Sequence, residues 1–260
     1  LPDWWDEAGS VAGIHAMDPA RFGYFRDVLE RRLGRPLGGL RVLDLGAGGG
    51  LLTEKLLGAG ALAVGLDRAE GALRVAAAHA RASGLVAPYV RGDARALPFA
   101  AGAFDAVTAC DFLEHVAEHR VAVLRECARV LAPGGVFLFD TINRTWLTRL
   151  FHIGVLQEWR KLVPRDTHAW GDFVRPEELE RNLARAGLVP VETRGLVPAR
   201  PVRFGLHLLA RRPGDRRPMP PFRIGRWRAG SYVGYALAPP AGASAGTASI
   251  TPPACSAGRS

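Results

Sequence analysis

Three side chains that can carry protons or bind a cation lie close together in the middle of the chain: Asp111, Glu114 and His115. They follow Cys110, at the end of an apolar stretch. Carboxylate and imidazole groups act as general bases, and they can also bind a hard divalent cation such as Mg²⁺. The same residues also fit an ordinary helix start, because acidic side chains in a first turn interact favourably with the helix dipole. The pattern therefore predicts either a catalytic or metal-binding cluster or a simple helix start.

A glycine-rich turn at residues 46–50 is the strongest motif in the sequence. Its glycines allow a sharp strand-to-helix turn whose backbone N–H groups come close to a ligand. A dinucleotide fingerprint that begins at Gly46 would need glycine at position 51, where Leu51 stands. The sequence fits Asp-x-Gly-x-Gly-x-Gly instead, with Asp44 first and Gly46 and Gly48 following.

This pattern is similar to the first motif of class I S-adenosylmethionine-dependent methyltransferases, and the similarity implies that Asp44 lies near the methionine amino group of the cofactor. Asp67 ends the second predicted strand and suits a bidentate contact with ribose hydroxyls. Asp93 ends the third, where such enzymes contact the adenine amino group. A structural glycine turn is one alternative. NAD binding is another, because an acid after strand two serves either cofactor, although Leu51 and the lack of a catalytic Tyr-x-x-x-Lys motif disfavour it.

Short apolar strands alternate with helical segments through the first part of the chain, which predicts an α/β fold with a parallel, doubly wound sheet. Strands are expected at 41–46, 62–67, 88–93, 104–111 and 136–141, and helices at 18–33, 50–58, 69–82 and 117–131. Asp18 is the predicted N-cap of the first helix. A helix at 176–186, a strand near 188–197, an Arg/Pro-rich excursion at 198–228 and a strand near 231–238 follow. We therefore expect a Rossmann-like, seven-stranded class I methyltransferase sheet with helices on both faces, an N-terminal helix and a lid-like insertion after strand five.

The domain organisation expected from these patterns is a single methyltransferase domain at residues 1–238. It contains a cofactor-binding core at 40–141 and a lid or substrate insertion at 142–171. Residues 239–260 are rich in Ala, Gly, Ser, Thr and Pro, which predicts a low-complexity, disordered tail.

The insertion supplies the candidate substrate and lid residues Asn143, Trp146 and His168. Within 144–163, apolar residues recur at helical spacing and basic residues flank them. Such a segment can cover an apolar substrate or lie on a membrane surface, and it equally fits a helix that faces the core. A single histidine such as His168 is more often structural than functional.

Charge is distributed unevenly along the chain, which carries a formal net charge of +9. Residues 1–143 hold 15 basic and 17 acidic side chains, and residues 144–228 hold 18 and 8, a net charge of +10 for the second segment. A basic half can meet nucleic acid, anionic lipid or only solvent. No nucleic-acid-binding motif accompanies it, so no nucleic-acid partner is expected. Three scattered cysteines, no signal peptide and no apolar run of membrane-spanning length favour a cytoplasmic protein, peripheral to the membrane if 144–163 contacts it.

Beyond the glycine motif, the chain resembles the polyprenyl-quinol O-methyltransferases of ubiquinone biosynthesis. The resemblance extends to about Leu237 and is most specific in three segments, Trp-Trp-Asp at 4–6, Thr-Ile-Asn-Arg-Thr at 141–145 and Val-Pro-Arg-Asp-Thr-His at 163–168. Less specific matches lie at 18–24, 43–50, 65–67, 113–116 and 133–135.

The resemblance implies S-adenosylmethionine contacts at Arg21, Gly46, Asp67 and Cys110. It also implies that Asp111, Glu114 and His115 bind a divalent metal, although the family more often has Glu at position 111. The insertion matches the segment thought to approach the membrane and the polyprenyl tail. The 198–228 region is longer than in the family, and the tail is foreign to it.

The expected function is S-adenosylmethionine-dependent O-methylation of a phenolic or catechol hydroxyl, with a polyprenyl quinol as one acceptor. An alternative keeps the cofactor and methylates an oxygen or carbon of a secondary metabolite. An alternative of a different class is NAD-dependent oxidoreduction.

Overall fold

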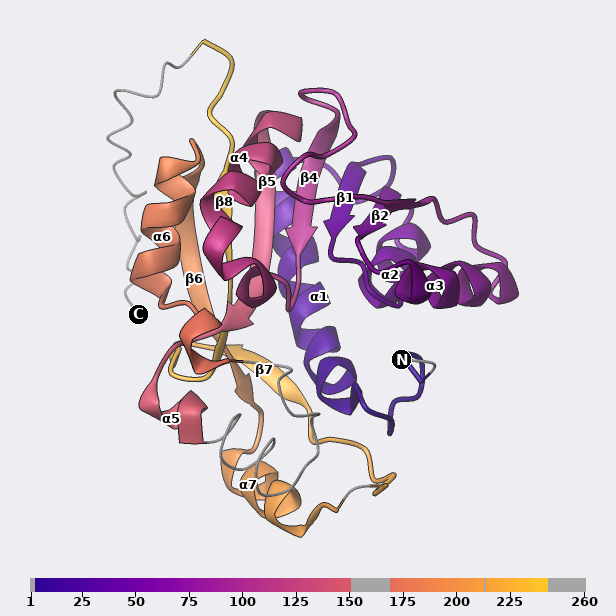
Figure 1. Ribbon diagram of the computed structural model, residues 1–260, viewed down its shortest axis with the longest axis vertical. Coiled ribbons are helices and arrows are strands. Elements are labelled where there is room, and N and C mark those ends of the chain that lie inside the picture. The colour runs from indigo at the N-terminus through magenta and orange to yellow at the C-terminus, as the bar shows by residue number, and fades with distance from the viewer. Residues whose placement is uncertain (1–2, 151–168, 213, 243–260) are drawn as a thin grey trace, which may run out of the picture.

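The computed structural model describes residues 3–150, 169–212 and 214–242. An eight-stranded sheet passes through the molecule, and helices cover both of its faces (Figure 1). The strand order is β3-β2-β1-β4-β5-β8-β6-β7. The order reverses beside β1, so β1 and β4 form the switch point at which ligands bind in sheets of this kind.

Five parallel strands form the first part of the sheet. They are β1 (Arg41–Leu45), β2 (Leu62–Asp67), β3 (Tyr89–Arg91), β4 (Phe104–Ala109) and β5 (Leu131–Ile142). All five expected strands are therefore present, with ends shifted by up to five residues.

The last three strands lie beside β5 and are joined through an antiparallel strand. β8 (Ser231–Leu237) runs antiparallel to both β5 and β6 (Val189–Pro198), and β7 (Phe222–Gly225) adds an edge strand beside β6. The sheet thus has one strand more than the seven expected, because β7 forms within the 198–228 region. That region also contains a helix, α7.

The helices lie between and beyond the strands. They are α1 (Ala12–Leu33), α2 (Leu51–Gly58), α3 (Glu70–Ala82), α4 (Arg120–Val130), α5 (Trp146–Thr148), α6 (Pro176–Arg185) and α7 (Pro201–Ala210), with short 3₁₀ helices η1 (Leu113–His119) and η3 (Trp170–Asp172). The segment expected as one helix at 117–131 is η1 followed by α4.

Two hydrophobic clusters pack on opposite faces of the sheet, because both faces of its central strands are buried. Leu43, Val107 and Phe137 belong to the cluster that contains residues of α4 and α6. Their neighbours Val42 and Ala106 belong to the cluster with α1 and α2. This packing fixes the carboxyl ends of β1, β4 and β5 relative to one another.

The first helix begins earlier than predicted, at Ala12, so Asp18 is not its N-cap. Asp18 is buried inside α1 and forms ion pairs with Arg21 and Lys55. A carboxylate with two cationic partners has no need of a helix terminus. Arg21 is one helical turn away, whereas Lys55 lies in α2 and cannot be recognised as a partner from the local sequence.

The described parts of the insertion are α5 and η3. Positions 151–168, which include His168 and most of the candidate lid, lie outside the described residues, as does the tail from 243 onward. None of the helices in the described ranges has the length and hydropathy required to cross a bilayer.

Candidate active site

The glycine-rich turn joins β1 to α2 at the switch point. Gly46, Gly48 and Gly50 have φ values of 76°, 51° and 88°, a region that side chains disfavour. Asp67, at the end of β2, accepts a hydrogen bond of 2.9 Å from the backbone N–H of Gly48. The glycine-rich turn and Asp67, which were both predicted to bind the cofactor, therefore lie in direct contact.

Two tryptophans cover this turn, and sequence reasoning did not place them there. A Cβ on Gly48 or Gly49 would come within 2.7 or 2.4 Å of the Trp4 ring. Trp5 donates from Nε1 to the Gly49 carbonyl at 3.0 Å and stacks on His79 with ring centroids 3.4 Å apart. Only the Trp-Trp-Asp resemblance signalled these residues, and it carried no information on location.

Asp44 lies buried beneath the turn. Its two carboxylate oxygens accept hydrogen bonds from Thr53 (2.6 Å) and Thr108 (2.9 Å), which ties β1 to α2 and β4. Burial raises the pKa of this carboxyl. Its predicted proximity to the methionine amino group of a cofactor stays a prediction.

Arg21 connects α1 to the ends of β4 and β5. Its Nη1 atom donates to Asp111 at 2.9 Å and to Asp140 at 2.8 Å, and the guanidinium is almost fully buried. Asp140 also accepts a 2.6 Å hydrogen bond from the backbone N–H of Asp111. Burial raises the pKa of Asp140 to about 6, against the opposing effect of Arg21 and with a further upward contribution from Asp111. Sequence reasoning missed Asp140, although an acid near the end of the fifth strand was the available signal.

Glu114 lies buried in η1, where its Oε2 accepts a 2.7 Å hydrogen bond from the Thr141 hydroxyl. Burial, and secondly the charge of Asp111, raises the pKa of Glu114 to about 8. The carboxyl is therefore largely protonated at neutral pH, and its conjugate base is unusually strong for a carboxylate.

The metal-binding prediction for Asp111, Glu114 and His115 does not fit this arrangement. Asp111 binds Arg21, Glu114 is buried against Thr141, and His115 is exposed. Adjacent residues of a 3₁₀ helix point in different directions, which separates the last two side chains. Over the described ranges, no three His, Cys, Asp or Glu side chains are grouped as a metal site requires.

Cys110 and Asp93, two further predicted cofactor contacts, lie in contrasting surroundings. The Cys110 thiol is next to Arg21, Asp111 and Asp140, which together form the Arg21 cluster. Burial, followed by the charge of Asp140, raises the pKa of the thiol. Asp93 is half-buried and pairs with Arg95 at 2.6 Å, and hydrogen bonds from Arg95 lower its pKa to about 2.

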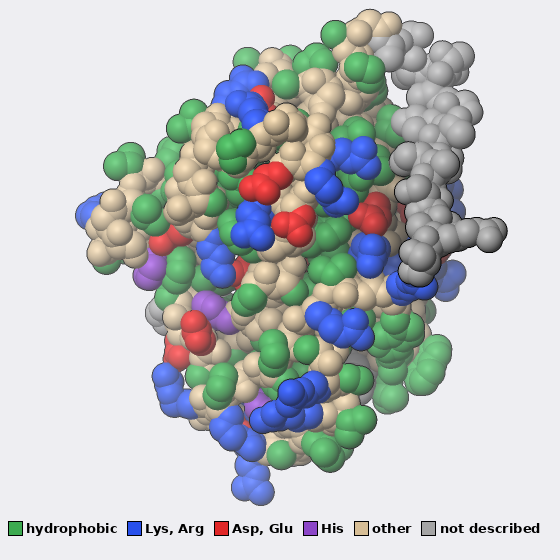
Figure 2. Space-filling view, turned by 180° about the vertical axis from the view of Figure 1, so that it is seen from behind, with side chains coloured by type: hydrophobic (Ala, Val, Ile, Leu, Met, Phe, Trp, Pro, Cys, Tyr) green, Lys and Arg blue, Asp and Glu red, His purple; other side chains and the backbone are tan. Residues whose placement is uncertain are grey.

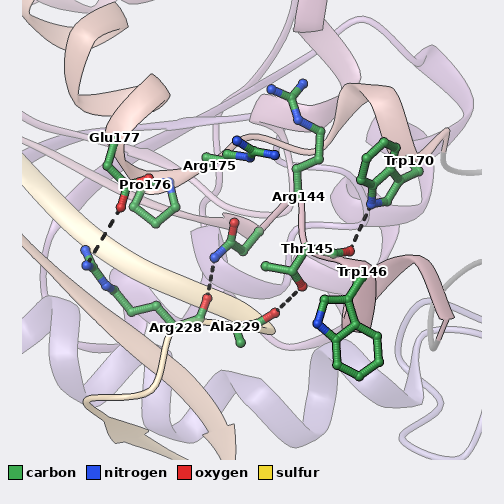
Figure 3. Close-up of a pocket in the computed structure, with 10 residues that line it drawn as sticks. Arg144, Thr145, Trp146, Trp170, Arg175, Pro176, Glu177, Arg228 and Ala229 are labelled. Carbon is green, nitrogen blue, oxygen red and sulfur yellow. Dashed lines mark hydrogen bonds and ion pairs between the residues drawn. The ribbon is translucent and has the colours of Figure 1, made fainter.

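A pocket of about 610 Å³ lies between the end of β5, the start of α6 and the start of β8 (Figure 3). Two of the three predicted substrate residues, Asn143 and Trp146, line it together with Trp170 and Arg175. Asn143 donates from Nδ2 to the Arg228 carbonyl at 2.6 Å.

Five buried side-chain polar atoms have no hydrogen-bond partner within the described residues: Trp4 Nε1, Arg21 Nε, Tyr89 Oη, Glu114 Oε1 and Asn143 Oδ1. Tyr89 lies against the glycine turn, with its hydroxyl 2.3 Å from where a Cβ of Gly50 would stand. Buried polar atoms are rarely left unpaired in folded proteins. All five border the glycine turn, the Arg21 cluster or the pocket, so these groups fit a bound cofactor and acceptor.

Comparison with known proteins identifies the class to which this fold and site belong. The sequence model of the family described as a methyltransferase domain matches residues 43–139. An S-adenosylmethionine-dependent methyltransferase from Methanosarcina mazei shares the fold with a TM-score of 0.56 at 19% identity, covering 78% of this chain and 93% of its own. A protein from Pyrococcus horikoshii gives a TM-score of 0.61 at 19% identity, covering 92% and 96%. The chain is an S-adenosylmethionine-dependent methyltransferase.

Curated relatives define the family more closely. A ubiquinone biosynthesis O-methyltransferase from Azorhizobium caulinodans is 40% identical over 200 residues, which cover 75% of this chain and 79% of that protein. One from a Methylobacterium is 42% identical over 202 residues, covering 75% and 80%. The chain belongs to the ubiquinone biosynthesis O-methyltransferase family, as the sequence resemblance indicated, and the oxidoreductase alternative is set aside.

Proposed function

We propose that this enzyme transfers a methyl group from S-adenosylmethionine to a phenolic hydroxyl of a catechol or quinol, as the names of its relatives suggest. The observation that carries the proposal is the set of five unpartnered buried polar atoms, which extends from the glycine turn to the pocket. A nucleic-acid acceptor is not expected.

The cofactor would lie across the glycine turn. Gly46 and Gly48 would allow close backbone approach, Asp67 is suited to the ribose hydroxyls, and Arg21 and Cys110 are further proposed cofactor contacts. Asp93 is the proposed contact of the adenine amino group. To accept a hydrogen bond from that group, it would give up part of its present ion pair with Arg95. When bound, S-adenosylmethionine supplies a methyl group on a cationic sulfonium.

Glu114 is the proposed base. Methyl transfer breaks the methyl–sulfur bond and forms a methyl–oxygen bond, and the phenolic proton must leave. A phenol has an ordinary pKa of about 10, so a carboxylate whose pKa is raised to about 8 accepts its proton far more readily than an ordinary one. The unpartnered Oε1 is the atom that would receive it.

The pocket beyond β5 is the proposed site of the acceptor ring. Asn143 Oδ1 can accept a hydrogen bond from a hydroxyl of the acceptor that is not methylated. Trp146 and Trp170 supply aromatic surface at the same pocket. The segment 144–163 remains the proposed point of contact with a polyprenyl tail and the membrane, and His168 the proposed end of the lid.

Methyl transfer from labelled S-adenosylmethionine to catechol, with and without a chelator, tests the proposal. We expect methylated product in both cases, because Glu114 can accept the proton without a metal. Activity lost with chelator and restored by Mg²⁺ would mean that Asp111, Glu114 and His115 rearrange around a cation. Binding of S-adenosylhomocysteine without any methylation of catechols or quinols would contradict the acceptor and favour a secondary metabolite.

A further inference from the structure

The helix α7 is fixed to the protein body by one of its faces. Phe204 packs edge-to-face on Phe222 of β7 at 5.3 Å, and Leu208 is buried. Arg211, just after the helix, is buried and donates to the backbone carbonyls of Arg217 and Ala8. These contacts hold the helix in place without any contribution from its opposite side.

That opposite side carries an apolar stripe exposed to solvent. Val202, Leu206 and Leu209 are 77%, 63% and 51% exposed. They occupy positions i, i+4 and i+7, which lie on one face of a helix. Apolar residues on the outer face of a helix contribute no hydrophobic stabilisation unless another surface covers that face.

Unpaired arginines surround this stripe. Arg200, Arg203 and Arg212 are exposed, and none forms a side-chain ion pair or hydrogen bond with the described part of the chain. Figure 2 shows basic and hydrophobic side chains interleaved over the lower end of the molecule, where Figure 1 places α7. Figure 1 places α5 towards the same end, and Trp146 in α5 and Leu150 just after it are 74% and 55% exposed.

We propose that α7 is an interfacial helix that binds the surface of an anionic lipid bilayer, with Val202, Leu206 and Leu209 inserted among the acyl chains and the arginines at the headgroups. A basic helix with an apolar face lies in the membrane interface in this way. At ten residues, or about 15 Å, it is far too short to span a bilayer. The inference concerns the 198–228 region and does not depend on the proposed reaction.

The chemistry of the surface favours lipid over a second copy of the chain. A stable protein interface buries about 800 Å² on each partner, and three aliphatic side chains expose much less. The region 144–228 has a net charge of +10, so two identical copies meeting at this face would repel each other. The same charge is complementary to anionic headgroups.

Flotation of the full chain with phospholipid vesicles tests the proposal. We expect binding to vesicles of phosphatidylcholine mixed with phosphatidylglycerol and much weaker binding to phosphatidylcholine alone. The double change Leu206→Ser and Leu209→Ser should weaken binding by at least about tenfold. Val86→Ser is the matched control, because Val86 is 92% exposed on the loop between α3 and β3 and should have no effect.

The charge component has a separate variant. Changing Arg200, Arg203 and Arg212 to Gln should weaken binding to the anionic vesicles by about fivefold for each arginine. Methylation of a water-soluble catechol should be unchanged in both variants, because α7 does not contribute to the proposed active site. This control separates a loss of membrane binding from a loss of folded, active enzyme.

Three outcomes would overturn the proposal. The first is wild-type protein that does not float with anionic vesicles. The second is binding that survives the α7 changes and is abolished by Trp146→Ser with Leu150→Ser, which would assign the membrane contact to α5 alone. The third is a dimer in light scattering that the Leu206 and Leu209 changes convert to monomer, which would make the stripe a protein interface.

Discussion

Acidic side chains gather at the ends of β4 and β5. Asp111 and Asp140 share the buried guanidinium of Arg21, which also pairs with Asp18. Glu114 is buried close to Asp111, and its ionised form is disfavoured first by burial and then by the charge of Asp111. The pKa values are raised to about 6 for Asp140 and to about 8 for Glu114. Proton acceptance by Glu114 is thus a consequence of its burial beside a second carboxylate.

The pH dependence of turnover should follow Glu114. Since the base form is required, kcat should rise as the pH increases towards about 8 and level off above it. Glu114→Gln should lower kcat by roughly a hundredfold and remove this rise. Thr141→Val deletes a hydrogen bond that lowers the Glu114 pKa, so the rise should move to higher pH. An unchanged pH profile in Glu114→Gln would assign the proton to another group.

Cofactor affinity should depend on Asp67. Asp67→Asn leaves an acceptor for the Gly48 N–H and removes the charge that suits ribose hydroxyls, so S-adenosylhomocysteine should bind roughly tenfold more weakly in calorimetry. Asp105→Asn is the control, because Asp105 pairs with Arg41 near the amino end of β4. Equal affinities for wild type and Asp67→Asn would contradict the assigned role.

The positions of candidate site residues were predictable from the sequence where an acidic side chain directly follows a predicted strand. Asp67 met the glycine turn as expected because parallel strands bring their carboxyl ends to one edge. Trp4 and Tyr89 were not predictable, because their contacts with the turn depend on packing between distant segments. The metal role of Asp111, Glu114 and His115 stays a prediction, and in the structure Glu114 is buried whereas the next residue of η1, His115, is exposed.

At the scale of the elements, α1 is the support for Arg21, and a glycine within the helix and another at its C-cap have opposite roles. Gly23 is within the helix, and a Cβ there would meet nothing within 4 Å. Gly23→Ala should therefore stabilise the protein by about 0.5–1 kcal/mol, seen as a higher Tm. Gly34 ends the helix with φ of 66°, so Gly34→Ala should destabilise it by about 1 kcal/mol. The opposite order of Tm values would show that the local backbone differs.

Element positions followed from hydrophobic periodicity and turn residues, and boundaries depended on tertiary contacts. The strands β1 and β4 were predicted to within two residues, whereas β5 begins five residues earlier than expected. The predicted start of α1 was wrong because Asp18 pairs with Lys55 of α2 and does not cap the helix. The strand β7 was missed because a four-residue edge strand is defined by its pairing with β6. Both contacts join segments that are far apart in the sequence.

At the scale of the whole molecule, β8 joins the two parts of the sheet. It pairs with β5 on one side and β6 on the other, and at Gly234 the strands approach closely: a Cβ would lie 2.5 Å from the Glu192 carbonyl oxygen and 2.6 Å from the Phe139 ring.

Gly234→Ala should therefore cost about 1–3 kcal/mol of stability. In hydrogen exchange, amides of β6 and β7 should lose protection before those of β1 and β4. Gly230→Ala, where a Cβ would meet nothing within 4 Å, is the matched control. Uniform loss of protection across the sheet would show that the two parts unfold as one unit.

The position of β8 also has a consequence for the order of folding. β6 and β7 precede it in the chain, yet they reach the rest of the sheet only through it. Until residues 231–237 have been synthesised and inserted, the edges of β5 and β6 stay unpaired. Strand edges of this kind are where nascent chains associate wrongly. We therefore expect the slow step in the folding of this enzyme to be the insertion of β8 between β5 and β6, which must already be formed.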